Sequence, residues 1–206
     1  MLKVAVTGSI ASGKSLFASL LESRGAVVID ADLLGHELIR KTGSAYAPVL
    51  GTFGPDILGP DGEIDRKVLG RKVFADPAAR ERLNGLVHPA LIAELARRIE
   101  GAERSGAQGA IVDAALVYEL GLADAFDAVI VVTSPVERQI ERLLGRGLDE
   151  AEARKRIAAQ LDQGEKSRRG DFHVVNAGTR ESLEAEAERV WNAIRRLDPE
   201  PKKRGL

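Results

Sequence analysis

The chain has 206 residues, of which 44% are hydrophobic and 30% charged, and its formal net charge is −1. A balance this close to neutral gives no whole-molecule attraction to nucleic acid or to an anionic membrane. The absence of cysteine excludes disulfides, cysteine-ligated zinc and thiol chemistry. No apolar run reaches the roughly 20 residues of a membrane span, and the N-terminus lacks the apolar core of a signal peptide. We therefore expect a cytoplasmic protein with no nucleic-acid, membrane or obligate protein partner.

The chain begins with a predicted strand, a loop and a helix. Lys3–Thr7 is apolar and β-branched and is followed by a glycine, which predicts a short buried strand. After the loop, Lys14–Arg24 carries leucines at helical spacing and ends before Gly25, which predicts a helix and its stop. Val27–Ile29 is predicted as a second strand, and it leads into the acidic sequence Asp30-Ala31-Asp32.

The next predicted strand, Gly109–Asp113, lies too far along the chain for a simple crossover. The intervening residues contain a turn-rich patch, Gly54–Gly62, and several segments with helical patterns. The predicted helices are Leu33–Lys41, Ala79–Leu86 and Ala90–Glu103. We interpret the stretch of about residues 33–107 as an inserted helical lobe that holds a second substrate.

The remaining residues return to alternating strands and helices. Gly109–Asp113 and Ala128–Val132 are near-continuous apolar runs, which are typical of parallel strands covered on both faces by helices. Pro135 is predicted to open the next helix, with Ser134 as its cap. The alternation predicts a doubly wound α/β core formed by residues 1–32 and 108–198 of a single domain. The basic tail Pro199–Leu206 is assigned no role.

The loop between the first strand and the first helix, Gly8–Ser15, fits the phosphate-binding pattern G-x-x-x-x-G-K-[ST]. Two glycines let the backbone curl until successive N–H groups point into one concavity, and the helix adds its positive N-terminal end. Lys14 can then reach the β- and γ-phosphates of ATP, and the Ser15 hydroxyl can bind Mg²⁺. We assign ATP contacts to Gly8, Ala11, Ser12, Gly13, Lys14, Ser15 and Leu16.

Asp32 follows the second strand, where the carboxyl ends of parallel strands open into a ligand crevice. A carboxylate there can accept the proton of an attacking hydroxyl, which favours a small-molecule kinase. Asp30 or Asp32 can also cap the helix predicted from Leu33, and for Asp32 the two roles are compatible. The sequence Asp32-Leu33-Leu34-Gly35 fits the D-x-x-G of GTPase switches as well, but the N-K-x-D sequence that would specify guanine is absent.

Arg138, Arg142 and Arg146 recur every four residues and are predicted to share one helix face. Guanidinium groups on one face can clamp ATP phosphates and neutralise charge during transfer. Arg142 and Arg146 are the better candidates, and Arg142 is assigned a catalytic role. Acidic neighbours leave open an ordinary salt-bridged surface. The region of about residues 143–169 is highly charged and helical, and it fits either a solvated face or a mobile lid.

Several motifs, taken together and in order, resemble the dephospho-coenzyme A kinase family over about residues 3–195. They are the phosphate loop, Val28–Asp32, Phe53–Arg66, Val73-Phe74, His88-Pro89, Asp113–Glu119, Arg138–Arg146, Ala158–Gln160 and Asn176–Gly178. The resemblance implies a P-loop nucleotide-kinase fold with a five-stranded parallel sheet, an acceptor lobe and a lid. It also implies Mg²⁺-dependent transfer of the γ-phosphate of ATP to the ribose 3′-hydroxyl of dephospho-coenzyme A, the last step of coenzyme A biosynthesis.

The resemblance assigns roles to single residues as well. It implies Asp32 as general base, and Asn176 and Gly178 as part of a loop near the adenine. The residues that it places on the substrate side are Asp32, Arg66, His88 and Asp113, although His88 also fits a structural hydrogen bond. The sequence departs from the family pattern at Ser9 and Ala11, where glycines are common, and at Ala114-Ala115, which replaces a proline-containing sequence. His173 stands where an apolar strand residue is usual, so the fifth strand is predicted to be short or shifted.

Overall fold

The computed structural model describes residues 1–197, which form two compact units. Within the described residues, the first unit contains residues 1–30 and 99–197, and the second contains Ala31–Arg98. The basic tail Pro199–Leu206 and the last residue of the predicted core, at position 198, lie outside the described residues. Within residues 1–197, no helix is both long and apolar enough to cross a membrane.

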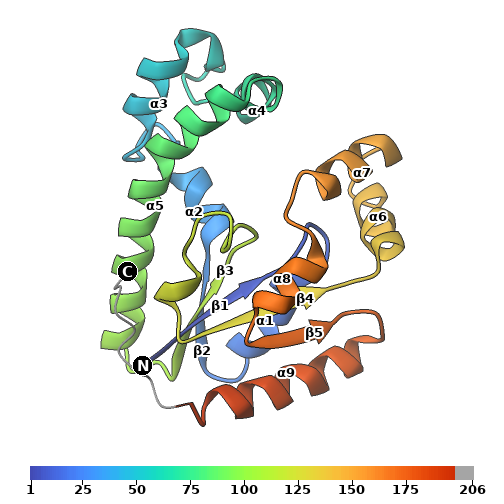
Figure 1. Cartoon of the computed structure of the whole chain (residues 1–206). Coiled ribbons are helices and arrows are strands. Elements are labelled where there is room, and N and C mark those ends of the chain that lie inside the picture. The colour runs from blue at the N-terminus through green and yellow to red at the C-terminus, as the bar shows by residue number, and fades with distance from the viewer. Residues whose placement is uncertain (198–206) are drawn as a thin grey trace. The chain divides into compact units, whose positions relative to one another are not determined.

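The first unit is built on one five-stranded sheet in which every pair of neighbouring strands is parallel (Figure 1). The strand order is β2-β3-β1-β4-β5. The strands are β1 (Leu2–Thr7), β2 (Ala26–Asp30), β3 (Gly109–Asp113), β4 (Ala128–Thr133) and β5 (Phe172–Val175). The predicted doubly wound α/β core with five parallel strands is therefore confirmed. β5 is short, with four residues, and its His173 lies opposite Val131 in the register.

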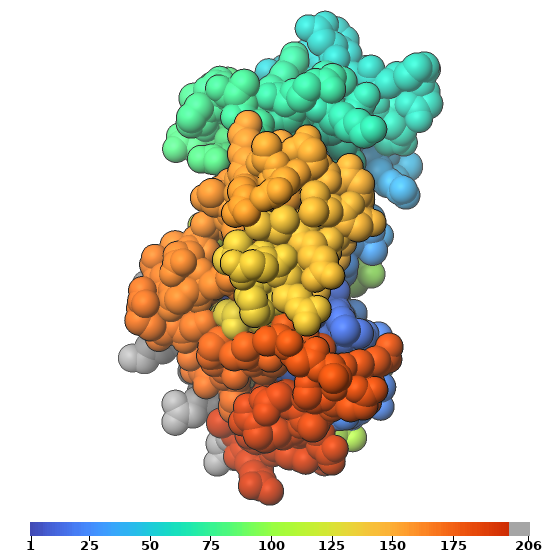
Figure 2. All heavy atoms as spheres, turned by 90° about the vertical axis from the view of Figure 1, so that its right-hand side faces the viewer, coloured from blue at the N-terminus to red at the C-terminus, as the bar shows by residue number. Residues whose placement is uncertain are grey.

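The helical elements of this unit are α1 (Lys14–Glu22), the 3₁₀ turn η2 (Ala123–Ala125), α6 (Val136–Leu144), α7 (Glu150–Ala158), α8 (Gln163–Arg169) and α9 (Arg180–Ile194). Of these, α1 and α9 bury apolar residues against the sheet. Phe17 and Leu21 of α1 and Trp191 of α9 form one buried cluster with apolar strand residues. Burying each such side chain is worth about 1.5–3 kcal/mol, so this packing holds the end of β1 and the start of α1 in place. Figure 2 shows α9 in red and the surface over α6 and α7 in yellow to orange.

The second unit is helical in the described residues. Its elements are α2 (Ala31–Leu38), α3 (Tyr46–Phe53), the 3₁₀ turn η1 (Pro55–Ile57), α4 (Arg66–Ala75) and most of α5 (Pro77–Arg104). The turn-rich patch closes through a bridge between Leu58 and Ile64 and a hydrogen bond from the Tyr46 hydroxyl to the Gly62 carbonyl. The patch thereby fixes the start of α4, where the Asp65 side chain caps the first turn.

Two local predictions are wrong. The predicted break between Ala79–Leu86 and Ala90–Glu103 does not occur, because α5 is continuous with Pro89 inside it. A proline in a helix costs about 3 kcal/mol, and buried apolar residues on its C-terminal side, among them Leu95, offset that cost. Ser134 does not cap α6: Pro135 occupies the cap position without a side-chain bond, and the Ser134 hydroxyl donates instead to the Asn176 carbonyl.

Candidate active site

The glycine-rich loop joins β1 to α1, and its two framing glycines are required by close contacts. A Cβ atom on Gly8 would collide with the Val132 carbonyl oxygen. A Cβ atom on Gly13 would collide with the Asn176 side-chain nitrogen, and Gly13 has φ of 97°, a left-handed conformation that favours glycine. The loop closes internally through a hydrogen bond of 3.0 Å from the Ser12 N–H to the Ser9 carbonyl.

Ala11 also adopts a left-handed conformation, with φ of 60°. A residue with a Cβ atom is uncommon in this conformation, which explains why glycine is common at this position in the family that the sequence resembles. Ser9 is buried. The loop therefore keeps the backbone of the pattern at Ala11 even though the residue type departs from it.

Lys14 and Ser15 begin α1 and present different chemistry. The Lys14 ammonium lies 2.8 Å from a carboxylate oxygen of Asp113, and the two side chains are 12% and 3% exposed. Asp113 ends β3, directly beside Val6 of β1. Ser15 is exposed in the first turn of α1, and Leu16 beside it is 39% exposed. The sequence predicted a phosphate role for Lys14 and a substrate role for Asp113, and the structure brings the two groups together.

The three arginines do not share one helix face as predicted. α6 ends at Leu144, so Arg146 lies beyond it. Arg138 is exposed and lies 3.7 Å from Glu141, as an ordinary surface pair. Arg142 alone reaches the loop: it donates to the Ala11 carbonyl at 2.8 Å and to the Ser134 hydroxyl at 3.3 Å. Burial, followed by the positive charge of Arg138, lowers the pKa of Arg142 from its ordinary value.

Asn176 lies against the same loop. It follows β5, is 7% exposed, and donates from its side-chain nitrogen to the Ser12 carbonyl at 2.8 Å. The side-chain amide of Asn176, a residue predicted to lie near the adenine, therefore binds the phosphate loop in this structure. Gly178, two residues further, is exposed.

Sequence reasoning missed two contributors to the site. Gln160 accepts a hydrogen bond of 2.7 Å from the Ile10 N–H of the phosphate loop, and its only signal was its place in the Ala158–Gln160 motif. Lys166 is fully buried, donates to the Ala115 carbonyl at 2.8 Å and lies 2.9 Å from Glu119. No pattern in the charged segment distinguished Lys166 from its exposed neighbours.

The departure at Ala114-Ala115 leaves the backbone after β3 well bonded. The Ala114 N–H donates to the Val6 carbonyl, which extends the pairing with β1 by one residue. The Ala115 carbonyl accepts from the Thr7 hydroxyl at 3.2 Å and from Lys166. Asp113 is therefore held in a regular strand end.

Asp32 belongs to the second unit and lies in the first turn of α2, two residues after the end of β2. Its side chain is exposed. Because α2 begins at Ala31, Asp32 lies within the first turn and is not the N-cap, so the predicted capping role of Asp32 is wrong. A carboxylate at this position is nevertheless favoured by the helix dipole.

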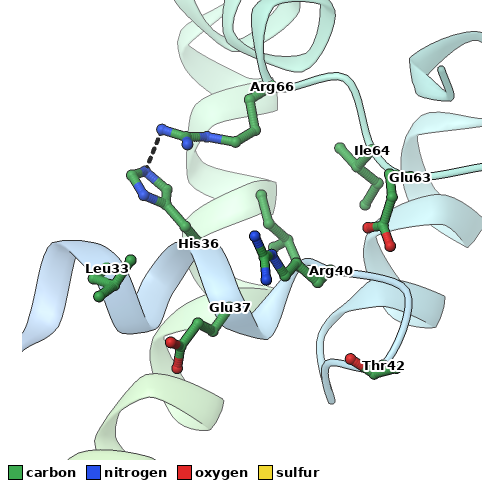
Figure 3. A pocket seen from close by; sticks show the side chains of 9 residues that line it. Leu33, His36, Glu37, Arg40, Thr42, Glu63, Ile64 and Arg66 are labelled. Atoms are coloured by element: carbon green, nitrogen blue, oxygen red, sulfur yellow. Dashed lines mark hydrogen bonds between the residues drawn. The ribbon is translucent and has the colours of Figure 1, made fainter. Parts of the chain in front are cut away.

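The second unit contains a cavity of about 450 Å³ bordered by α2 and the start of α4 (Figure 3). Arg66 and His36 meet there at 2.6 Å, and because arginine can only donate, the His36 Nε2 atom accepts. Arg40 and Glu63 line the same cavity. His88, predicted beside Arg66 on the substrate side, is a residue of α5 outside this lining, and burial lowers its pKa.

The parallel sheet, the glycine-framed loop between β1 and α1, and the lysine that opens this helix define the class of the protein. It is a P-loop kinase.

Comparison with known proteins identifies the family. The family model described as "CoaE: Dephospho-CoA kinase" matches residues 2–181. The dephospho-CoA kinase of Anaeromyxobacter dehalogenans is 49% identical, over 93% of this chain and 92% of that protein, and the one of Geobacter sulfurreducens is 46% identical, over 91% and 96%. The solved dephospho-CoA kinase from Campylobacter jejuni matches with a TM-score of 0.69 and 28% identity, over 93% of this chain and 96% of that chain. The chain therefore belongs to the dephospho-CoA kinase family, and it is an ATP-dependent kinase.

Proposed function

We propose that this kinase transfers the γ-phosphoryl group of ATP to the ribose 3′-hydroxyl of dephospho-coenzyme A, with coenzyme A and ADP as products. The single observation that carries the proposal is the phosphate loop braced in its curled form, with Lys14 and Ser15 at the start of α1, in a chain of this family.

The phosphate side of the reaction belongs to the loop and α1. Backbone N–H groups at the start of α1 bind phosphate oxygens, because these groups have no acceptor within the helix. Lys14 neutralises charge on the β- and γ-phosphates and is positioned by Asp113 before ATP arrives. Arg142 acts on the loop through the Ala11 carbonyl, and Arg146 remains a candidate for phosphate contact.

Mg²⁺ fits this donor set. The described residues contain no cluster of three or more histidine, cysteine or acidic side chains that would form an all-protein cage. Mg²⁺ in kinases is held by one or two protein groups together with substrate phosphates and water, and the exposed Ser15 hydroxyl is such a group. When bound, the ion neutralises negative charge on the phosphates as they transfer.

Asp32 is the proposed general base. In the transfer, the 3′-oxygen forms a bond to the γ-phosphorus, the bond from that phosphorus to the β,γ-bridging oxygen breaks, and the hydroxyl proton passes to the Asp32 carboxylate. The position of Asp32, two residues after a parallel strand of the nucleotide-binding sheet, supports this role.

The second unit is proposed as the acceptor lobe and the segment with α7 and α8 as the lid. The acceptor carries a diphosphate, and the cavity of the second unit offers Arg40 and Arg66 to it. Arg66 donates one N–H to His36 within this cavity, and because an arginine has five N–H donors, its remaining ones can bind an anionic ligand.

A coupled assay of ADP release tests the function. With Mg-ATP and dephospho-coenzyme A, we expect ADP to be released at the same rate as coenzyme A is formed. Coenzyme A formation is measured by chromatography of the product. A panel of nucleoside monophosphates in the same assay is expected to give far lower kcat/KM values. A nucleoside monophosphate that outperforms dephospho-coenzyme A would replace the acceptor while leaving the kinase class intact.

Replacing Arg66 with alanine is expected to raise KM for dephospho-coenzyme A by about 10- to 150-fold and to leave KM for ATP nearly unchanged, because a charge-assisted hydrogen bond of about 1.5–3 kcal/mol is lost on the acceptor side only. Initial rates with each substrate varied in turn give both constants. Arg71→Ala, at an exposed arginine of the same helix, is the matched control. An equal rise in both KM values would argue against an acceptor role for this arginine.

A further inference from the structure

Three side chains from outside the phosphate loop form hydrogen bonds to the backbone of three consecutive loop residues. Gln160, which follows α7, accepts from the Ile10 N–H; Arg142 of α6 donates to the Ala11 carbonyl; and Asn176, which follows β5, donates to the Ser12 carbonyl. The third contact lies next to Gly13, the residue that leads into α1. It therefore bears most directly on the N–H groups that meet a phosphate.

The Asn176 contact fixes the direction of one particular N–H. The Ser12 carbonyl and the Gly13 N–H belong to the same planar trans peptide, so they point in opposite directions. Because Asn176 binds the carbonyl from one side, the Gly13 N–H is turned to the other side. That N–H belongs to the start of α1, where no helical carbonyl is available to accept it.

Gly13 needs such a brace because it is a glycine. The close approach of the Asn176 amide leaves no room for a Cβ atom on Gly13. A glycine without a brace samples many backbone conformations, and most of them point its N–H elsewhere. The Asn176 amide therefore has two effects on Gly13: it leaves no space for a side chain there, and it restricts the backbone freedom that a glycine would otherwise have.

Asn176 is itself held rigidly. Its N–H donates to the Thr133 carbonyl at 2.7 Å, and its carbonyl accepts from the Ser134 hydroxyl at 2.9 Å. Both partners lie at the end of β4 and just after it. A donor fixed at both ends of its own backbone can hold a neighbouring peptide at little further entropic cost.

We propose that Asn176 is a positioning residue for ATP: it orients the Gly13 N–H toward the nucleotide phosphates, and its side chain makes no contact with the adenine. This inference rests on the proposed use of the loop for ATP, and it departs from the base-side role that the family resemblance implied. It predicts that Asn176 contributes to the affinity for the polyphosphate part of ATP and not to the affinity for the nucleoside part.

Three probes separate these alternatives when binding is measured by calorimetry on the full chain, without acceptor. They are ATP, inorganic tripolyphosphate, which has no base, and adenosine, which has no phosphate. In Asn176→Ala we expect ATP and tripolyphosphate each to bind about tenfold more weakly, in line with one lost hydrogen bond and a freed peptide, and adenosine to bind as in the wild type. Weaker binding of adenosine and ATP with unchanged tripolyphosphate would overturn the proposal, as would unchanged binding of all three.

Two further variants test whether a loss of affinity comes from the missing hydrogen bond or from a general loss of folded structure. Asn176→Asp keeps the side-chain volume but replaces the donor by an acceptor, so it is expected to lower tripolyphosphate affinity at least as much. Asn192→Ala, at an exposed asparagine of α9, is the control and should change none of the three affinities. Affinities are measured well below the unfolding temperature of each variant, and normal tripolyphosphate affinity in folded Asn176→Asp would also contradict the proposal. Because no acceptor is present, the result does not depend on which acceptor the enzyme uses.

Discussion

Asp32→Asn is expected to lower kcat for coenzyme A formation by about 10²- to 10⁴-fold while KM for ATP changes little. The substitution keeps the size and the hydrogen-bonding reach of the side chain but removes its ability to take a proton, and general-base catalysis contributes about that factor. The phosphate loop and α1 are unchanged, so ATP binding is expected to remain. The coupled ADP assay gives kcat and both KM values.

A purely structural role for Asp32 in the first turn of α2 predicts a different pattern. A carboxylate in the first turn of α2 stabilises the helix by about 0.3–1 kcal/mol through the dipole, so its loss would lower the unfolding temperature slightly without a large effect on kcat. Asp30→Asn, at the exposed acid that ends β2, is the matched control and should retain most activity. An Asp32→Asn enzyme with kcat within about threefold of wild type would remove Asp32 as the base and leave the kinase class in place.

Lys14→Met is expected to lower kcat/KM for ATP by about 10³-fold and also to destabilise the fold. The catalytic loss follows from removing the positive charge that meets the β- and γ-phosphates. The loss of stability has a separate cause: Asp113 is 3% exposed, and without Lys14 its carboxylate is left buried without its ion-pair partner. Breaking a buried pair in this way costs about 3–5 kcal/mol.

A double variant separates the two effects of Lys14. In Lys14→Met/Asp113→Asn the buried charge is gone from both sides, so much of the lost stability is expected to return in urea unfolding while kcat/KM stays low. If activity returned together with stability, Lys14 would act only by neutralising Asp113. If Lys14→Met unfolded at the wild-type urea concentration, the ion pair would not contribute to the fold.

The sequence by itself determined the elements that depend on local pattern. Gly8–Ser15 identified the phosphate loop because two glycines, a lysine and a serine at fixed spacing have few other uses between an apolar strand and a helix. The apolar runs identified β1 to β4 within about one residue of their bounds, since a strand covered on both faces is apolar throughout. The fifth strand, which contains His173, was expected only from the family resemblance. Helices α3 and α4 were not predicted, because their short patterns lie beside a turn-rich patch that obscures them.

Only the tertiary structure decided which side chains serve the loop. Asn176 and Arg142 lie 164 and 131 residues along the chain from the carbonyls that they bind, and each is a single polar residue whose partner is a backbone atom. A pattern along the chain carries no signal for such a contact, since any residue offers a carbonyl. For the same reason Gln160 appeared as a motif without a role, and Arg146 was grouped with Arg142 although α6 ends between them. Spacing determines the loop, and three-dimensional packing determines what holds it.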